Sequence, residues 1–181
     1  MVVAVLIIVA LILVNALYVA AEFAAVSVRR SRIQQLAADG NPLAAWLLPL
    51  IGSPVALDRY IAACQIGITL SSLVLGAYAQ RTIALGLAPM LTTLGNLSQV
   101  VAESTSAVVV LLGLTVLQVI ISELVPKTVA LQYPTQTALY TVVPMLPSMW
   151  IYRPFITWLN GTGLAVMRLM GVPQQSHRHI H

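Results

Sequence analysis

Charged residues are scarce in this sequence. Only 8% of the 181 residues are Asp, Glu, Lys or Arg, whereas 59% are hydrophobic. Soluble domains carry roughly 25% charged residues, so this composition excludes an ordinary water-soluble domain. We predict an all-α integral membrane protein, in which the helices face lipid and one another.

Cysteine is nearly absent, and so are groupings of catalytic residues. Cys64 is the single cysteine, which excludes an internal disulfide and a cysteine-based metal site. The spans contain no nucleophile–base pair, phosphate-binding loop or paired catalytic acids, so we predict that the protein is not an enzyme. The formal charge is +4, and in a membrane protein this excess bears on topology and anionic lipids rather than nucleic acid.

Long uncharged runs are abundant by contrast, and three of them predict membrane-spanning helices at about residues 2–28, 60–79 and 104–131. The first run lacks a basic leader and is too long for a signal peptide, so we expect it to be retained. A basic cluster, Arg29, Arg30 and Arg32, follows it directly. Such clusters stay in the cytoplasm, which places the N-terminus outside.

The connecting segments carry turn signals and interface residues. Residues 31–58 read as a cytoplasmic hairpin of two amphipathic helices, with its turn at Gly40-Asn41-Pro42. Residues 80–103 read as short helices resting on the outer surface. Residues 135–172, rich in proline and aromatics, read as a juxtamembrane helical belt in the inner interface, with a fourth crossing as the alternative. We predict that residues 173–181 form a linker. Its three histidines are more simply explained as solvated side chains than as metal ligands.

Each predicted span carries polar side chains at helical spacing on one face. Such stripes serve either as packing contacts between helices or as a route for an ion or solute. Three that converge, with a carboxylate among them, favour the route. For Glu22 alone we favour a simple interfacial pairing with an arginine. The stripes are Asn15, Glu22 and Arg29; Gln65, Thr69, Ser72 and Gly76; and Thr115, Gln118 and Ser122.

The stretch Ser-Glu-Leu-Val-Pro-Lys at 122–127 concentrates oxygen ligands at the end of the third span. An acid in hydrocarbon is costly and usually functional. Pro126 cannot donate the backbone hydrogen bond that a helix would send to the carbonyl of Ser122. A free carbonyl, a hydroxyl and a carboxylate suit hard cations such as Mg²⁺, Ca²⁺ or Na⁺. The alternative is that Glu123 pairs with Lys127 at i,i+4.

Three stretches resemble the transmembrane domain of the CorC/CNNM (cyclin M) family of magnesium transporters. They are AEFAAVSVRRSRI at 21–33, which runs on to Gly40-Asn41; GITLSSLVLG at 67–76; and ELVPKTVA at 123–130. Together the stretches and their spacing cover nearly the whole chain. The resemblance implies that a largely dehydrated Mg²⁺ is held between the spans and exported in exchange for Na⁺.

The resemblance also implies a ligand set. Glu123 takes the role of the charged metal ligand, and Ser71 and Ser72 match the hydroxyl pair of the second stretch. The remaining candidates are the hydroxyls of Ser27 and Thr69 and the backbone carbonyl of Gly67.

The family further implies a homodimer in the inner (plasma) membrane, with three spans per subunit, the C-terminus in the cytoplasm and a following pair of nucleotide-binding CBS domains. Residues 1–134 would then form the three-helix domain. The alternative function is a non-transporting membrane scaffold or Mg²⁺ sensor, in which the polar stripes serve only as packing and dimer contacts.

Overall fold

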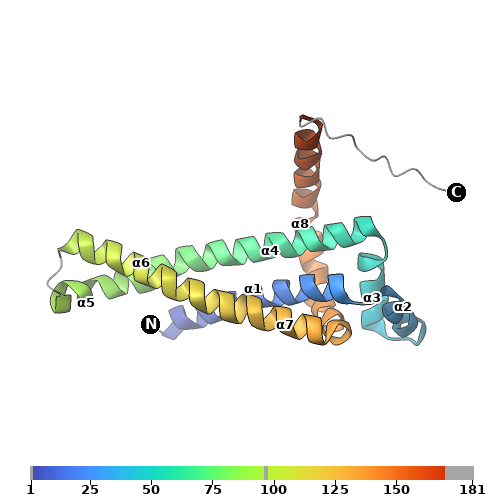
Figure 1. Ribbon diagram of the computed structural model, residues 1–181, viewed down its shortest axis with the longest axis horizontal. Coiled ribbons are helices and arrows are strands. Elements are labelled where there is room, and N and C mark those ends of the chain that lie inside the picture. The colour runs from blue at the N-terminus through green and yellow to red at the C-terminus, as the bar shows by residue number, and fades with distance from the viewer. Residues whose placement is uncertain (1, 96–97, 170–181) are drawn as a thin grey trace.

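The structure is a computed structural model that describes residues 2–95 and 98–169 (Figure 1). Every regular element in these residues is a helix, which confirms the predicted all-α class. The elements in chain order are α1 (Val2–Ser27), α2 (Arg30–Ala38), α3 (Pro42–Ile51), α4 (Pro54–Ala79), η1 (Gln80–Ala84), α5 (Leu85–Gly95), α6 (Gln99–Gln118), η2 (Val119–Leu124), α7 (Val125–Gln132) and α8 (Pro134–Leu169).

Three helical runs are long and apolar enough to cross a membrane, as predicted. The first is α1, the second joins α4, η1 and α5 over Pro54–Thr93, and the third joins α6, η2 and α7 over Gln99–Gln132. The three runs lie side by side along the long axis of the molecule (Figure 1). Together they make a multi-pass membrane protein.

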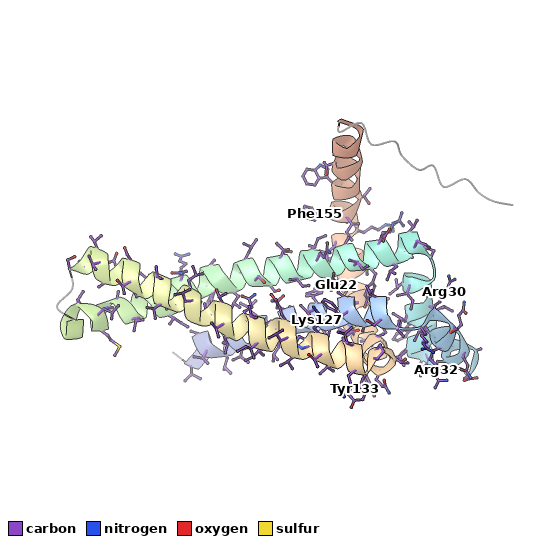
Figure 2. The ribbon with its side chains drawn as sticks, in the orientation of Figure 1. Glu22, Arg30, Arg32, Lys127, Tyr133 and Phe155 are labelled. Atoms are coloured by element: carbon purple, nitrogen blue, oxygen red, sulfur yellow. The ribbon has the colours of Figure 1, made fainter. Side chains whose placement is uncertain are left out.

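The short hairpin between the first two runs is built from strong capping signals. Gly40 adopts φ 88°, a left-handed conformation that glycine tolerates, and ends α2. Asn41 then caps α3, because its side-chain oxygen accepts the backbone N–H groups of Leu43 and Ala44 at 3.0 and 3.2 Å. Arg30 and Arg32 lie on α2, beyond the end of α1 (Figure 2).

The second and third runs are longer than the sequence patterns suggest. The predicted break after residue 79 is absent, because the helix continues through a π-helical turn, η1, into α5. Pro89 lies inside α5 without ending it. Residues 80–95 therefore extend the second run instead of resting on the surface as separate short helices. A second π-helical turn, η2, joins α6 to α7.

The last helix, α8, runs across the bundle rather than along it (Figure 1). It contacts α1, α3 and α4, and it is not among the candidate spans of the described residues. The sequence predicts several helices here, yet α8 continues through Pro144, Pro147 and Pro154. The end of the predicted belt and the histidine tail, residues 170–181, lie outside the described residues.

Apolar packing is concentrated where α8 crosses the bundle. Tyr60, Cys64 and Met145 are fully buried there, and Leu47 of α3 joins them. A second, smaller cluster lies farther along the bundle, around Leu75. Along α1 and α4, Asn15, Ser71 and Ser72 lie between these two clusters.

Candidate functional site

The close approach of α1 to α4 depends on Gly67. A β-carbon at this position would lie 2.5 Å from ring atoms of Tyr18 on α1, well inside van der Waals contact. The hydroxyl of Tyr18 lies 2.9 Å from Ser148 Oγ and 3.4 Å from the hydroxyl of Tyr152, both on α8. Burial raises the pKa of Tyr152 to about 12, and its contact with Tyr18 adds to this, so the hydroxyl stays protonated near neutral pH.

One turn of helix farther along, α1 and α4 exchange polar contacts. Asn15 is only 1% exposed, and its Nδ2 donates to Ser72 Oγ at 3.3 Å. Its Oδ1 accepts a hydrogen bond from Ser71 Oγ at 3.2 Å. The Ser71 hydroxyl also lies 2.7 Å from the carbonyl oxygen of Gly67. A buried asparagine must find such partners, because an unsatisfied amide is costly in an apolar setting.

The third run contributes a further side chain to the same place. Gln118, the last residue of α6, donates from Nε2 to Ser72 Oγ at 2.6 Å. Ser72 therefore joins all three membrane-crossing runs. We call Asn15, Ser71, Ser72 and Gln118 the polar cluster. Next to it, the buried hydroxyl of Ser122 donates to the carbonyl of Ile12 on α1 at 3.2 Å.

The π-helical turn η2 sets the direction of the residues around Glu123. The N–H of Val125 bonds the carbonyl of Ile120, five residues back. Pro126 follows and has no N–H to offer, which favours a wider turn at this point. π-Helical turns of this kind are frequently found at functional sites.

Glu123 itself lies outside the polar cluster. Its side chain is exposed, and within the described residues it has neither a hydrogen bond nor an ion pair. The alternative pairing with Lys127 is not formed, because Lys127 Nζ lies over the ring of Phe23 on α1, 4.7 Å from its centroid. Ser122 is buried against α1, whereas the next residue, Glu123, is exposed.

The remaining predicted ligands divide in the same way. The carbonyl of Gly67 borders the polar cluster through Ser71. Thr69 is exposed, and its hydroxyl donates to the carbonyl of Gln65 in its own helix at 2.8 Å. Ser27 is the last residue of α1, twelve positions from Asn15, or about 18 Å along a helix. The roles of Glu123, Ser72, Ser71, Ser27, Thr69 and Gly67 as ligands stay predictions.

Two members of the polar cluster are missing from the predicted ligand set. Asn15 and Gln118 both lie on the polar stripes that the sequence reveals, but the stripes alone do not say which members meet. The expected pairing of Glu22 with an arginine is wrong, since Glu22 Oε1 instead accepts from Gln65 Nε2 at 3.4 Å. That contact lies on the same α1–α4 interface as the polar cluster.

The chemistry available here is that of neutral oxygens. In the part of the chain that the structure describes, no three His, Cys, Asp or Glu side chains gather in a group that could hold a metal. Hydroxyl, amide and carbonyl oxygens remain, and these suit hard cations rather than zinc or copper.

The sequence of this chain is similar to those of known proteins. The family model described as the cyclin M transmembrane N-terminal domain matches residues 6–181. This chain belongs to the cyclin M (CNNM) family. Among relatives from Bacillus subtilis, UPF0053 protein YrkA is 35% identical over 175 residues, and UPF0053 protein YhdT is 38% identical over 172.

These matches cover 94% of this chain but only 39% of YrkA and 36% of YhdT. The chain therefore spans about two fifths of the length of these relatives. A more distant relative, the polyamine export protein of Haemophilus influenzae, is 27% identical over 168 residues, or 93% of this chain and 38% of that protein.

Proposed function

We propose that this chain is the membrane-crossing part of a Mg²⁺ transporter that exports Mg²⁺ in exchange for Na⁺. The observation that carries the proposal is the meeting of amide and hydroxyl groups from all three runs at Ser72. Membership of the cyclin M family supports Mg²⁺ as the transported ion.

The polar cluster offers oxygens of the right kind. Mg²⁺ takes six oxygens in a near-octahedral shell at about 2.0–2.1 Å and gives up its water reluctantly. Asn15 Oδ1, the two serine hydroxyls and the Gly67 carbonyl lie within one hydrogen-bonded group. Binding an ion here replaces hydrogen bonds between protein groups with ion–oxygen contacts. The hydroxyl oxygens are already present, so they need only rotate toward the ion. Na⁺ competes for the same oxygens, which gives a simple route to exchange.

Glu123 supplies the charge in this proposal, and η2 is the element that moves it. A π-helical turn holds one more residue than an α-helical turn, so closing it to α-helix rotates its flanks by about 100° relative to each other. That rotation equals the angular separation of Ser122, which faces α1, from Glu123. A change in η2 is therefore of the right size to bring the carboxylate toward the polar cluster.

The proposed oligomeric state, membrane topology and additional domains are based on family membership and on the length of the relatives. We propose a homodimer in the inner (plasma) membrane, with the N-terminus outside and the belt helix α8 on the cytoplasmic side. The relatives are more than twice as long as this chain, and we propose that their additional length includes the expected nucleotide-binding CBS domains.

The test is Mg²⁺ flux into sealed vesicles that contain the chain and a Mg²⁺-sensitive dye. Glu123→Gln removes the proposed charge without changing size, and we expect it to abolish the Na⁺-dependent flux. Glu103→Gln is the matched control, since the exposed carboxylate of Glu103 accepts only from Gln99 of its own helix, at 3.0 Å. Equal flux in both variants and the wild type would contradict the proposal.

Two alternatives give different results in the same vesicles. The polar cluster groups satisfy one another without an ion, as contacts in a membrane scaffold would. A scaffold shows no flux in any variant, and Ser72→Ala then lowers only the stability of the dimer. The name of the Haemophilus influenzae relative suggests a polyamine as cargo. In that case spermidine, and not Mg²⁺, crosses the membrane with the same dependence on Glu123.

A further inference from the structure

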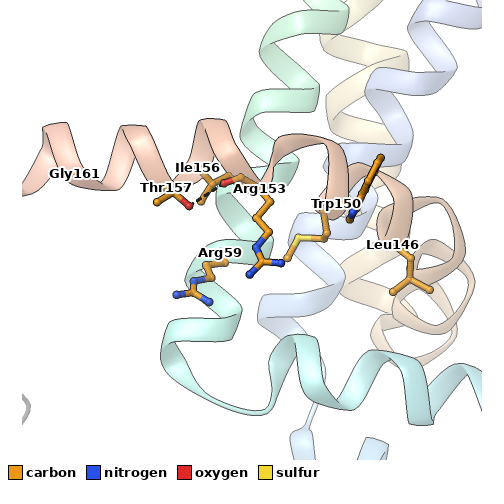
Figure 3. Close-up of a pocket in the computed structure, with 8 residues that line it drawn as sticks. Arg59, Leu146, Trp150, Arg153, Ile156, Thr157 and Gly161 are labelled. Atoms are coloured by element: carbon orange, nitrogen blue, oxygen red, sulfur yellow. Dashed lines mark hydrogen bonds between the residues drawn. The ribbon is translucent and has the colours of Figure 1, made fainter.

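A pocket of about 630 Å³ lies where α8 passes the N-terminal turns of α4 (Figure 3). The Arg153 side chain extends from α8 toward the part of α4 from which Arg59 projects. Apolar side chains, among them Leu146 and Ile156, and the ring of Trp150 line the rest. The pocket is remote from the polar cluster, which lies on the opposite part of α4, a dozen residues farther along the chain.

Neither arginine has an ion-pair partner within the described residues, although Asp58 directly precedes Arg59 in the chain. Both side chains are exposed, and neither forms an ion pair or a side-chain hydrogen bond there. The neighbouring hydroxyl of Thr157 is directed to the backbone carbonyl of Arg153, at 2.9 Å. Two guanidinium groups that share one pocket repel each other, so an anion between them is favoured. Phosphate fits best, because the planar fork of arginine matches its oxygens.

The position of the pocket relative to the membrane narrows the choice of anion. Because α8 crosses the bundle, it lies close to the plane of a bilayer whose normal follows the three runs (Figure 1). Trp150 and Trp158 are 78% and 63% exposed, and Phe155 stacks on Trp158 with ring centroids 5.9 Å apart. Exposed aromatic rings of this kind gather at the level of lipid headgroups.

We propose that this pocket binds the phosphate headgroup of an anionic phospholipid. Arg59 and Arg153 hold the phosphate, Trp150 lies at headgroup level, and an acyl chain runs along Leu146 and Ile156. The apolar lining favours a lipid over a free phosphate, because a free phosphate would leave the Trp150 ring, which is 78% exposed, uncovered. The bound lipid then bridges α4 and α8, so it ties the belt to the second span. Nothing in this inference depends on which ion the protein transports.

The experiment is native mass spectrometry of the 181-residue chain in detergent. Phosphatidylglycerol and phosphatidylcholine with the same acyl chains are titrated separately into wild type, Arg59→Gln/Arg153→Gln and Arg81→Gln. Arg81 is the matched control, because it is an exposed arginine in η1, far from α8. We expect phosphatidylglycerol to bind the wild type and the Arg81 variant in preference to phosphatidylcholine. The affinity should fall roughly fivefold for each pocket arginine removed and about 30-fold for both.

Further controls distinguish the loss of charge from unfolding. A competition experiment distinguishes lipid binding from binding of a soluble phosphate. Arg153→Lys keeps a positive charge and should retain most of the preference. The labelling rate of buried Cys64 by a thiol dye reports whether each variant is folded. Two results would overturn the proposal. One is unchanged phosphatidylglycerol binding by the folded double variant, and the other is displacement of the lipid by an equal concentration of glycerol phosphate.

Discussion

Replacing Gly67 with alanine tests the close contact between α1 and α4. The added β-carbon would lie 2.5–2.6 Å from three atoms of the Tyr18 ring, where carbon atoms pack at about 3.5–4.0 Å. The helices must separate by about 1 Å, or the ring must turn away from Ser148. Overpacking of this kind costs about 1–3 kcal/mol, and the better helix propensity of alanine returns at most about 1 kcal/mol. We therefore expect Gly67→Ala to lower the stability of the folded chain.

A thiol-reactive fluorescent dye gives the measurement. Cys64 is the single cysteine and is fully buried, so dye labelling during heating reports unfolding. Gly76→Ala is the matched control on the same helix, because its β-carbon would meet nothing within 4 Å. We expect the midpoint temperature of Cys64 labelling to fall for Gly67→Ala, and to stay the same or rise for Gly76→Ala. In a Tyr18→Ala background the cost of Gly67→Ala should shrink, since the obstructing ring is gone. Equal midpoints for the two glycine variants would refute the reasoning.

Three further predictions concern neighbouring contacts. Tyr18→Phe removes the hydroxyl that lies 2.9 Å from Ser148 Oγ, and should lower the midpoint of Cys64 labelling by the equivalent of about 1 kcal/mol. Lys127→Met removes the cation that lies 4.7 Å from the Phe23 ring centroid, and should cost about 0.5–2 kcal/mol in the same assay, with a smaller cost in a Phe23→Leu background. Pro126→Ala restores a backbone N–H, so η2 should close toward α-helix and show slower hydrogen–deuterium exchange; unchanged exchange would count against the role given to the proline.

The predictable parts of the fold are those that depend on local chemistry. Gly40 ends one helix through its backbone conformation, and Asn41 begins the next by capping it. Both signals can be recognised in the sequence. The long uncharged runs likewise predict three spans, because backbone groups in lipid must be satisfied within a helix.

The sequence does not predict the effect of prolines on helix length or the angular direction of side chains around a π-helical turn. Pro89 suggests a break after the second span, and Pro144 suggests one in the belt, yet both helices continue through them. Neighbouring helices can compensate for a missing backbone hydrogen bond, and a single sequence does not reveal where they do so.

The candidate site shows the same division. Helical spacing correctly places Ser72 and Gln118 on polar faces, and the structure brings them to 2.6 Å. It does not give the direction of Glu123, because Glu123 lies within the π-helical turn η2, where the angle per residue differs from that of an α-helix. A pattern read at 100° per residue therefore puts Glu123 closer to the polar face than the structure does.

The most direct test of a cation site at the polar cluster is calorimetry of Mg²⁺ binding to the purified chain, with and without Na⁺. Ser72→Ala removes the hydroxyl shared by all three runs, whereas Ser104→Ala removes an exposed hydroxyl that bonds only its own helix at 2.9 Å. We expect Mg²⁺ binding that weakens with Na⁺ in wild type and in Ser104→Ala, and no Mg²⁺ binding in Ser72→Ala. Equal heats in all three folded proteins would contradict it.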